Sequence, residues 1–178
     1  MGKLLKWLAI GLVALVAVLT VGGLMLPRTF EVQRSALMQA PPERIYPQIA
    51  TPRHWPEWSV WNRRDPAMQI AYSGPEQGAG AVWSWKSKSQ GDGTMTLTAA
   101  EPPHRVAYDL YFPDFDTTST GELVLAPEAG GTRVTWTMTG DMGANPLYHW
   151  MPLVMGGAMR ADFDAGLANL KALVESGP

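Results

Sequence analysis

Apolar residues form two long patterns of different kinds, one at each end of the chain. Residues 7–26 hold no charged side chain, and a helix of that length, rising about 1.5 Å per residue, crosses the hydrocarbon of a bilayer. Over residues 155–174, large apolar side chains recur every three or four positions, which predicts an amphipathic helix. That stripe consists of Met155, Met159, Phe163, Leu167, Leu170 and Val174.

Between these two ends, apolar and polar residues mostly alternate, which is the pattern of half-buried β-strands. Residues 30–38 form the first such segment. Two short helical segments then begin near Pro42 and Pro52, because proline fits the first turn of a helix. Six further strands are predicted near residues 68–72, 83–86, 94–99, 106–112, 123–125 and 133–139. We therefore expect an α+β fold of the helix-grip type, in which a curved antiparallel sheet wraps around the long C-terminal helix.

The N-terminal apolar run is interpreted as an uncleaved transmembrane helix. It is longer than the roughly 7–15 apolar residues of a signal peptide, and its end offers no good cleavage site. The chain then divides into an anchor, residues 1–26, and a domain, residues 27–178. Residues 27–29 alone separate the anchor from the first strand, so the domain is expected to lie close to the membrane surface.

Charges on either side of the run indicate its orientation. Lys3 and Lys6 precede it, whereas Arg28 follows it close to Glu31. The positive-inside rule then places the N-terminus in the cytoplasm. We expect a single-pass protein of the cell (inner) membrane whose domain is extracytoplasmic, which in a bacterium means periplasmic.

Composition excludes several classes of function. Basic and acidic residues number 14 and 16, and without a basic patch the domain is not expected to bind nucleic acid. There is no cysteine, which excludes disulfides and a cysteine nucleophile. His54, His104 and His149 stand apart without metal-binding spacing, so we expect neither a metal nor a cofactor.

Large side chains on the inward faces of the strands and helix are the main functional signal. They either line a ligand cavity or fill a core, since both are built from aromatic and aliphatic groups. The cavity-lining candidates are Arg34, Tyr72, Trp83, Trp85, Met95, Leu97, Tyr108, Leu110, Phe112, Trp136, Met138, Met159, Phe163 and Leu167. Small residues on the long helix favour open space, because they leave volume for other groups. These are Gly157, Ala158, Ala161, Ala165 and Gly166.

Two further features carry open alternatives. Trp55, Trp58 and Trp61 crowd one short segment, where they either gate the mouth of a pocket or pack locally to pin the short helices. Arg34 falls on the apolar face of its strand and is the first candidate for a buried polar anchor. A β-bulge that turns Arg34 outward is the simpler explanation.

Several short sequence segments, taken in order along the chain, resemble those of the START-like or SRPBCC superfamily, in particular its polyketide cyclase/dehydrase-like branch. They lie at residues 40–46, 54–59, 72–75, 78–81, 84–85, 101–103, 130–136 and 162–171. The resemblance covers about residues 30–175, and the membrane anchor is an addition to it. It implies a cavity between sheet and helix, which the superfamily uses for lipids, sterols, polyketides and other apolar molecules.

We therefore expect a membrane-anchored START-like domain that binds a hydrophobic small molecule, such as a lipid, isoprenoid or polyketide-like ligand. One alternative is a cyclase- or dehydratase-like enzyme acting on such a ligand, which requires a titratable group such as Tyr108 or Arg34 in the cavity. Another is an envelope protein-interaction module without a ligand, which predicts a filled core and an exposed apolar patch. We favour binding over catalysis and assign no catalytic residue. The sequence does not indicate an oligomeric state.

Overall fold

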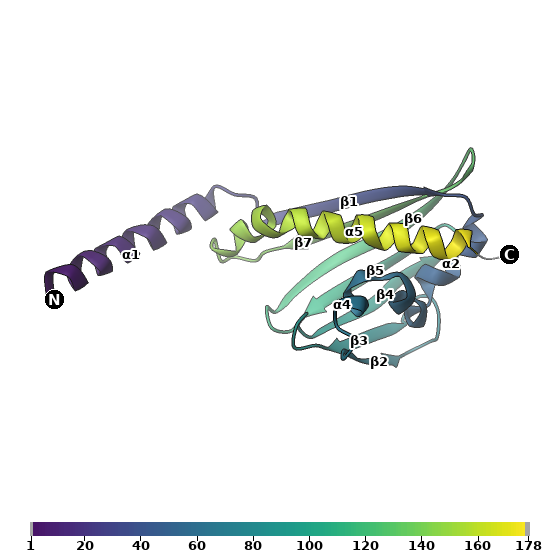
Figure 1. Cartoon of the computed structure of the whole chain (residues 1–178), viewed down its shortest axis with the longest axis horizontal. Helices are drawn as coiled ribbons and strands as arrows, with labels where there is room; N and C mark the ends of the chain where they lie inside the picture. Colours follow the sequence, from purple (N-terminus) through teal and green to yellow (C-terminus); the bar gives the residue numbers. More distant parts are fainter. Residues whose placement is uncertain (1, 177–178) are drawn as a thin grey trace.

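The computed structural model describes residues 2–176 and contains one seven-stranded antiparallel sheet with a long helix across one face (Figure 1). The strands are β1 (Thr29–Met38), β2 (Gln69–Ser73), β3 (Val82–Lys86), β4 (Gly93–Glu101), β5 (Arg105–Phe112), β6 (Thr117–Glu128) and β7 (Gly131–Asp141). The helices are α1 (Gly2–Leu24), α2 (Pro42–Ala50), η1 (Pro52–His54), α3 (Trp55–Trp58), α4 (Val60–Arg64), η2 (Tyr148–Trp150) and α5 (Met151–Glu175). The predicted α+β helix-grip fold is confirmed.

Strand order in the sheet is β1-β7-β6-β5-β4-β3-β2, so β1 leaves its sequence neighbours and pairs with the last strand. The pairing of β1 with β7 runs without interruption from Thr29 opposite Asp141 to Met38 opposite Thr132. A register shift between Leu97 and Ala99 interrupts the pairing of β4 with β5. Because successive side chains alternate between faces, this register sends most of the large apolar residues toward α5 and most of the threonines toward solvent.

The inward face of α5 follows the predicted stripe for most of its length. Phe163, Leu167, Leu170 and Val174 are buried, which matches a helix that covers a sheet. Met155 was predicted to belong to this stripe, but it lies outside the core and is exposed. The helix also begins at Met151, before the predicted start, because Pro152 fits its first turn.

The short helix α2 closes one end of the space between α5 and the sheet. α2 contacts β5, β6 and α5, and it lies near the C-terminal end of α5 in Figure 1. Its Ile45, Tyr46 and Ile49 are buried in the core. Helix α2 therefore caps the core at this end. The opposite end, where β1 and α5 begin, faces α1.

Helix α1 projects away from the domain at the end where β1 and α5 begin (Figure 1). Its length and apolar composition are sufficient to cross a membrane, and nearly all of it is exposed. Its C-terminal turn contacts η2 of the domain.

Candidate functional site

The space between the sheet and α5 is occupied in its middle by aromatic rings. Trp136 from β7 stacks on Phe163 from α5, with ring centroids 4.1 Å apart and planes 15° apart. Trp55 and Trp58 lie 5.9 and 5.4 Å from the Trp136 ring in edge-to-face arrangements. Such contacts indicate that the middle of this space holds a well-packed aromatic cluster rather than an open cavity.

Tyr108 contributes a polar group to this cluster. The indole Nε1 of Trp136 donates a hydrogen bond to the Tyr108 hydroxyl oxygen at 2.8 Å. Gly121 lies opposite Tyr108 on the neighbouring strand, and the phenol ring fills the place where a side chain of residue 121 would lie. Burial raises the pKa of Tyr108 well above its ordinary value, so its hydroxyl stays protonated at neutral pH. It can therefore donate a hydrogen bond but not act as a base.

Burial of the predicted cavity-lining residues divides them into two groups. Eight are fully buried: Trp83, Met95, Leu97, Tyr108, Trp136, Met138, Phe163 and Leu167. Six are half-buried: Arg34, Tyr72, Trp85, Leu110, Phe112 and Met159. The structure thus brings the whole set to the inner face, with part of it incompletely covered.

The half-buried residues include a group at the end of the domain nearest α1. Leu110 and Phe112 end β5, while Trp85 lies near the end of β3 and Phe30 near the start of β1. Met159, in the first half of α5, is half-buried as well. Inward apolar surface therefore stays partly uncovered where the sheet and helix approach α1, and this is the candidate binding region.

The small residues of α5 were predicted to leave open space, but most of them lie on its outer side. Gly157, Ala158, Ala161 and Ala165 are exposed to solvent. Gly166 alone faces inward, where a Cβ atom would lie 3.0 Å from Trp136. The volume that Gly166 leaves is therefore taken by a tryptophan ring.

The tryptophan-rich segment is fixed to α5 rather than free to open. Trp55 and Trp58 are buried in the core, whereas Trp61 is half-buried at its border. The Asn169 side chain donates to the carbonyl oxygen of Trp58 at 3.0 Å. This arrangement fits the local-packing alternative, and Trp61 alone lies where it can border an opening.

An ion pair between α4 and α5 was missed by sequence reasoning. Arg64 Nη1 donates to a carboxylate oxygen of the buried Asp162 at 2.8 Å. The hydrogen bond to Asp162 raises the pKa of Arg64. Asp162 directly precedes Phe163 of the apolar stripe. An acidic residue at the border of a buried stripe is the sequence signal that could have indicated a basic partner. The pair holds α4 against α5.

Arg34 lies at the seam between β1 and α5. Continuous pairing of β1 with β7 leaves no bulge at Arg34, so the expectation that a bulge turns it outward is wrong. Its Nε atom lies 3.1 Å from a carboxylate oxygen of Asp164 on α5. Both side chains are partly exposed, so Arg34 joins strand to helix at the rim and is not a deeply buried anchor.

Several buried polar atoms have no hydrogen-bond partner among residues 2–176, and they include the Ser59 hydroxyl and the Trp83 indole nitrogen. The indole Nε1 of Trp83 is buried and makes no hydrogen bond in that part of the chain. The Trp83 and Tyr108 rings both contact Trp55, with centroid distances of 5.9 and 5.7 Å. An unpartnered buried donor is costly unless something accepts its hydrogen bond, so Trp83 is the interior group best suited to a polar atom of a ligand.

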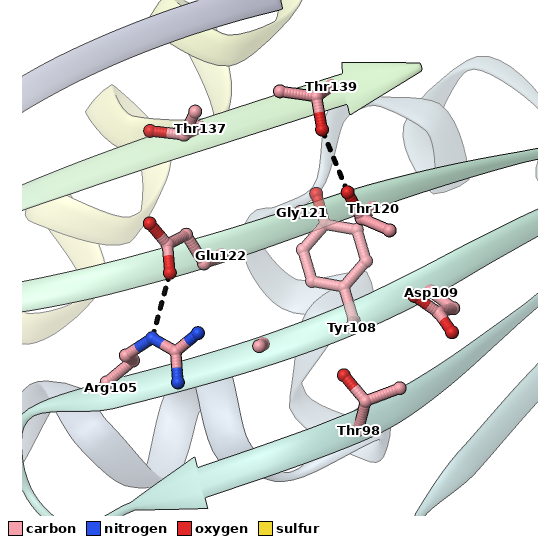
Figure 2. Close-up of a pocket in the computed structure, with 10 residues that line it drawn as sticks. Thr98, Arg105, Tyr108, Asp109, Thr120, Gly121, Glu122, Thr137 and Thr139 are labelled. Carbon is pink, nitrogen blue, oxygen red and sulfur yellow. Dashed lines mark hydrogen bonds and ion pairs between the residues drawn. The ribbon is translucent and has the colours of Figure 1, made fainter. Parts of the chain in front are cut away.

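The outer face of the sheet carries a shallow polar depression of about 190 Å³, which Figure 2 shows. Its lining residues are Thr98, Arg105, Ala107, Tyr108, Asp109, Thr120, Gly121, Glu122, Thr137 and Thr139. Arg105 pairs with Glu122 at 2.8 Å, and the hydroxyls of Thr120 and Thr139 lie 2.8 Å apart. The main charges and hydroxyls are thus satisfied by one another, and nothing in this depression points to chemistry.

A second depression of about 330 Å³ lies at the edge of the sheet beside η1 and β2. The Arg53 guanidinium covers the Tyr72 ring at 4.4 Å from its centroid. Among residues 2–176, no cluster of three or more His, Asp or Glu side chains could hold a metal ion. The inner face near α1 therefore remains the best candidate site.

Several solved structures have the same fold as this chain. A protein from Chromobacterium violaceum superposes with a TM-score of 0.58 at 19% identity, covering 85% of this chain and 99% of that one. The di-domain ARO/CYC protein BexL from the BE-7585A biosynthetic pathway gives 0.60 at 20%, covering 85% and 52%. Ara h 8.0201 gives 0.61 at 14%, covering 84% and 99%. At these identities the likeness shows the fold alone.

The sequence itself gives the family. No curated protein matches the chain. Residues 29–175, which span all seven strands and α5, match the family described as polyketide cyclase / dehydrase and lipid transport. This chain therefore belongs to the polyketide cyclase/dehydrase and lipid transport family of the START-like, SRPBCC fold.

Proposed function

We propose that this protein is a single-pass membrane protein whose family domain binds an apolar small molecule, of lipid, isoprenoid or polyketide-like character, between the sheet and α5. The observation that carries the proposal is the half-buried apolar group at the α1 end, which includes Leu110, Phe112 and Trp85. Apolar surface left uncovered on an inward face is favourable for an apolar ligand, at about 25 cal/mol per Å² buried. The family description, which includes lipid transport, supports this class of ligand.

Polar recognition would come from a small number of interior donors. The Trp83 N–H group has no acceptor among the described residues, and Tyr108 remains a neutral phenol. A ligand oxygen near Trp83 would relieve the cost of burying an unpaired donor. A mostly apolar molecule with one carbonyl or hydroxyl oxygen fits these groups.

The length and apolar composition of α1 support membrane attachment, and the charges around it support a cytoplasmic N-terminus with an extracytoplasmic domain. Lys3 and Lys6 lie before the apolar part of α1, and Arg28 lies after it. Arg28 is also bound to Asp141. The uncovered end of the domain would then lie beside the membrane, where an apolar ligand is most concentrated.

Binding is favoured over catalysis by the state of the two titratable candidates. Tyr108 is held neutral by burial, and Arg34 is engaged by Asp164 at the rim. A protonated phenol cannot act as a base, and Arg34 lies at the rim rather than in the interior. The cyclase- or dehydratase-like alternative therefore lacks an assigned catalytic group in this chain.

The test is to identify what the full chain carries. We expect lipid extracts of the purified protein to contain an apolar molecule by mass spectrometry. Leu110→Trp should lower its occupancy several-fold, because a larger side chain fills the uncovered region. Thr118→Trp is the matched control, since Thr118 is exposed on the neighbouring strand β6 and should leave occupancy unchanged. Equal occupancy in the two variants would contradict the proposed site.

A second candidate is an envelope interaction module without a ligand. It is favoured by the filled middle of the domain, where Trp55, Trp58 and Trp136 are almost completely buried. The same extraction separates the two functions, because this candidate predicts that the wild-type chain, Leu110→Trp and Thr118→Trp carry the same amount of apolar molecule.

A further inference from the structure

Residues 142–159, which connect β7 to the first turns of α5, contain no Asp, Glu, Lys or Arg. Several of their large apolar side chains point outward from the domain. Leu147, Tyr148, Leu153, Val154 and Met155 are exposed, with Val154 at 80%. A contiguous exposed apolar surface of this kind marks a contact with another apolar phase or with a partner.

The same segment is bound to the end of α1. The Trp150 indole Nε1 donates to the carbonyl oxygen of Leu19 at 3.0 Å. The His149 Nδ1 atom lies 2.8 Å from the carbonyl oxygen of Gly23. A Cβ atom at Gly23 would overlap the backbone of Pro146, so this close approach requires glycine. The exposed apolar segment is therefore held at a fixed place along α1.

That place lies within the apolar length of α1 and not beyond it. Leu19 precedes Leu24, the last residue of α1, by five residues, which is about 7 Å along a helix axis. A side chain that contacts Leu19 therefore lies at the depth of the lipid if α1 spans a bilayer. Tyr148 and Trp150 are also of the residue types that are enriched at membrane interfaces.

Charged groups border the segment on both sides. Arg28 and Asp141 pair just before it. Arg160 follows it, is exposed, and has no ion-pair partner among residues 2–176. A long arginine side chain at this position can reach phosphate headgroups while its neighbours contact acyl chains.

We propose that residues 142–159 form a second membrane-contacting element, which lies in the interface of the bilayer beside α1 and contacts lipid acyl chains through Leu153, Val154 and Met155. The proposal rests on the membrane insertion of α1. It commits to lipid as the occupant because the segment contacts the last turns of α1 and holds no Asp, Glu, Lys or Arg. Its consequence is that the uncovered end of the inner face opens against lipid rather than against water.

The absence of native cysteine permits a direct test in the full chain. Single-cysteine variants Val154→Cys, Met155→Cys, Val16→Cys and Ala129→Cys would be labelled with bimane and placed one molecule per nanodisc of phosphatidylcholine. Lipids with brominated acyl chains then quench any label that they contact. Val16 lies within α1, and Ala129 lies in the β6–β7 turn at the other end of the domain.

We expect brominated lipid to quench labels at positions 16, 154 and 155, and to leave the label at position 129 unquenched. Quenching at position 16 with none at 154 or 155 would overturn the inference while leaving the anchor intact. No quenching at position 16 would overturn the membrane anchor itself, and with it this inference. One molecule per disc excludes a second copy as the occupant.

Discussion

Close contacts between glycines and aromatic rings shape the interior residue by residue. Four glycines of the sheet and α5 face a ring at the position where their own side chain would lie. The pairs are Gly93 with Trp85, Gly121 with Tyr108, Gly140 with Phe30, and Gly166 with Trp136. Each glycine lets a ring lie flat across a neighbouring strand or helix, which raises packing density where two large side chains would collide.

Replacing Gly121 with alanine tests this packing. A Cβ atom there would overlap the Tyr108 ring, so the ring must move and its hydrogen bond with Trp136 must lengthen. We expect Gly121→Ala to lower the free energy of unfolding by about 1–3 kcal/mol, as overpacking in a core does. Chemical denaturation followed by tryptophan fluorescence measures it.

Gly157→Ala is the control for Gly121→Ala. Gly157 is exposed within α5 and has open space around its Cα atom. Alanine there should leave stability unchanged or raise it by up to about 1 kcal/mol, because alanine has the higher helix propensity. Equal stability of Gly121→Ala and the wild type would show that Tyr108 is not confined as described.

Alternation along the strands predicted which side chains face inward, but it did not predict these contacts. Tyr108 on β5 meets Gly121 on the neighbouring strand β6, and Trp136 on the sheet meets Gly166 on α5, so neither pair is visible in local sequence spacing. The same limit explains the small residues of α5. Ala161 and Ala165 looked like open space, yet they lie on the solvent side, because composition alone does not give the rotation of a helix.

At the scale of elements, the junction between α1 and the sheet is tied by more than the peptide chain. The Met142 backbone N–H donates to the carbonyl oxygen of Arg28 at 2.7 Å. The Arg28 Nε atom donates to the carboxylate of Asp141 at 2.9 Å, and Asp141 also accepts from the Gly143 backbone at 2.8 Å. The linker between α1 and β1 is thereby fastened to the end of β7.

This junction should respond to acid through Asp141. Hydrogen bonds from Arg28 and from the Gly143 backbone lower the pKa of Asp141 in the folded chain. A lowered folded-state pKa contributes stability above the unfolded value of about 3.9, and that stability is lost as pH falls through the folded value. We expect Asp141→Asn to lower Tm above about pH 4, and the difference from wild type to disappear at lower pH.

The control for Asp141→Asn is Asp114→Asn, which removes a carboxylate from the exposed β5–β6 loop. Asp114 forms no ion pair among residues 2–176. Thermal unfolding from pH 2 to pH 6 should give the same profile for Asp114→Asn and the wild type. A Tm difference for Asp141→Asn that persists below the lowered folded-state pKa of Asp141 would contradict an ionic origin.

Element order was predictable from the sequence because each strand carries its own alternating pattern and each helix its own spacing. The residues at which the helices and strands begin and end were less predictable. For example, α4 ends at Arg64, which is held by an ion pair with Asp162, a residue 98 positions away in the chain. The contacts of His149 and Trp150 with Gly23 and Leu19 were not predictable either, because they depend on tertiary structure.

At the scale of the whole molecule, the contacts described above make α1 and the domain one body rather than two parts on a loose tether. Pro146, His149 and Trp150 hold the last turns of α1. A fixed angle between the two parts would set how the uncovered end of the inner face is presented to the bilayer. The sequence predicted proximity from the short linker, but not this docking.

Substitution of Gly23 tests the docking of α1 on the domain. Any side chain at Gly23 collides with Pro146, whereas Gly11 has open space around it. With spin labels on Val18→Cys and Lys88→Cys, the wild-type chain in nanodiscs should give one narrow distance distribution. Gly23→Leu should broaden that distribution because α1 loses its fixed contact, and Gly11→Leu should leave it narrow. A broad distribution in the wild-type chain would show that α1 moves freely, and a narrow unchanged one in Gly23→Leu would show that other contacts hold it.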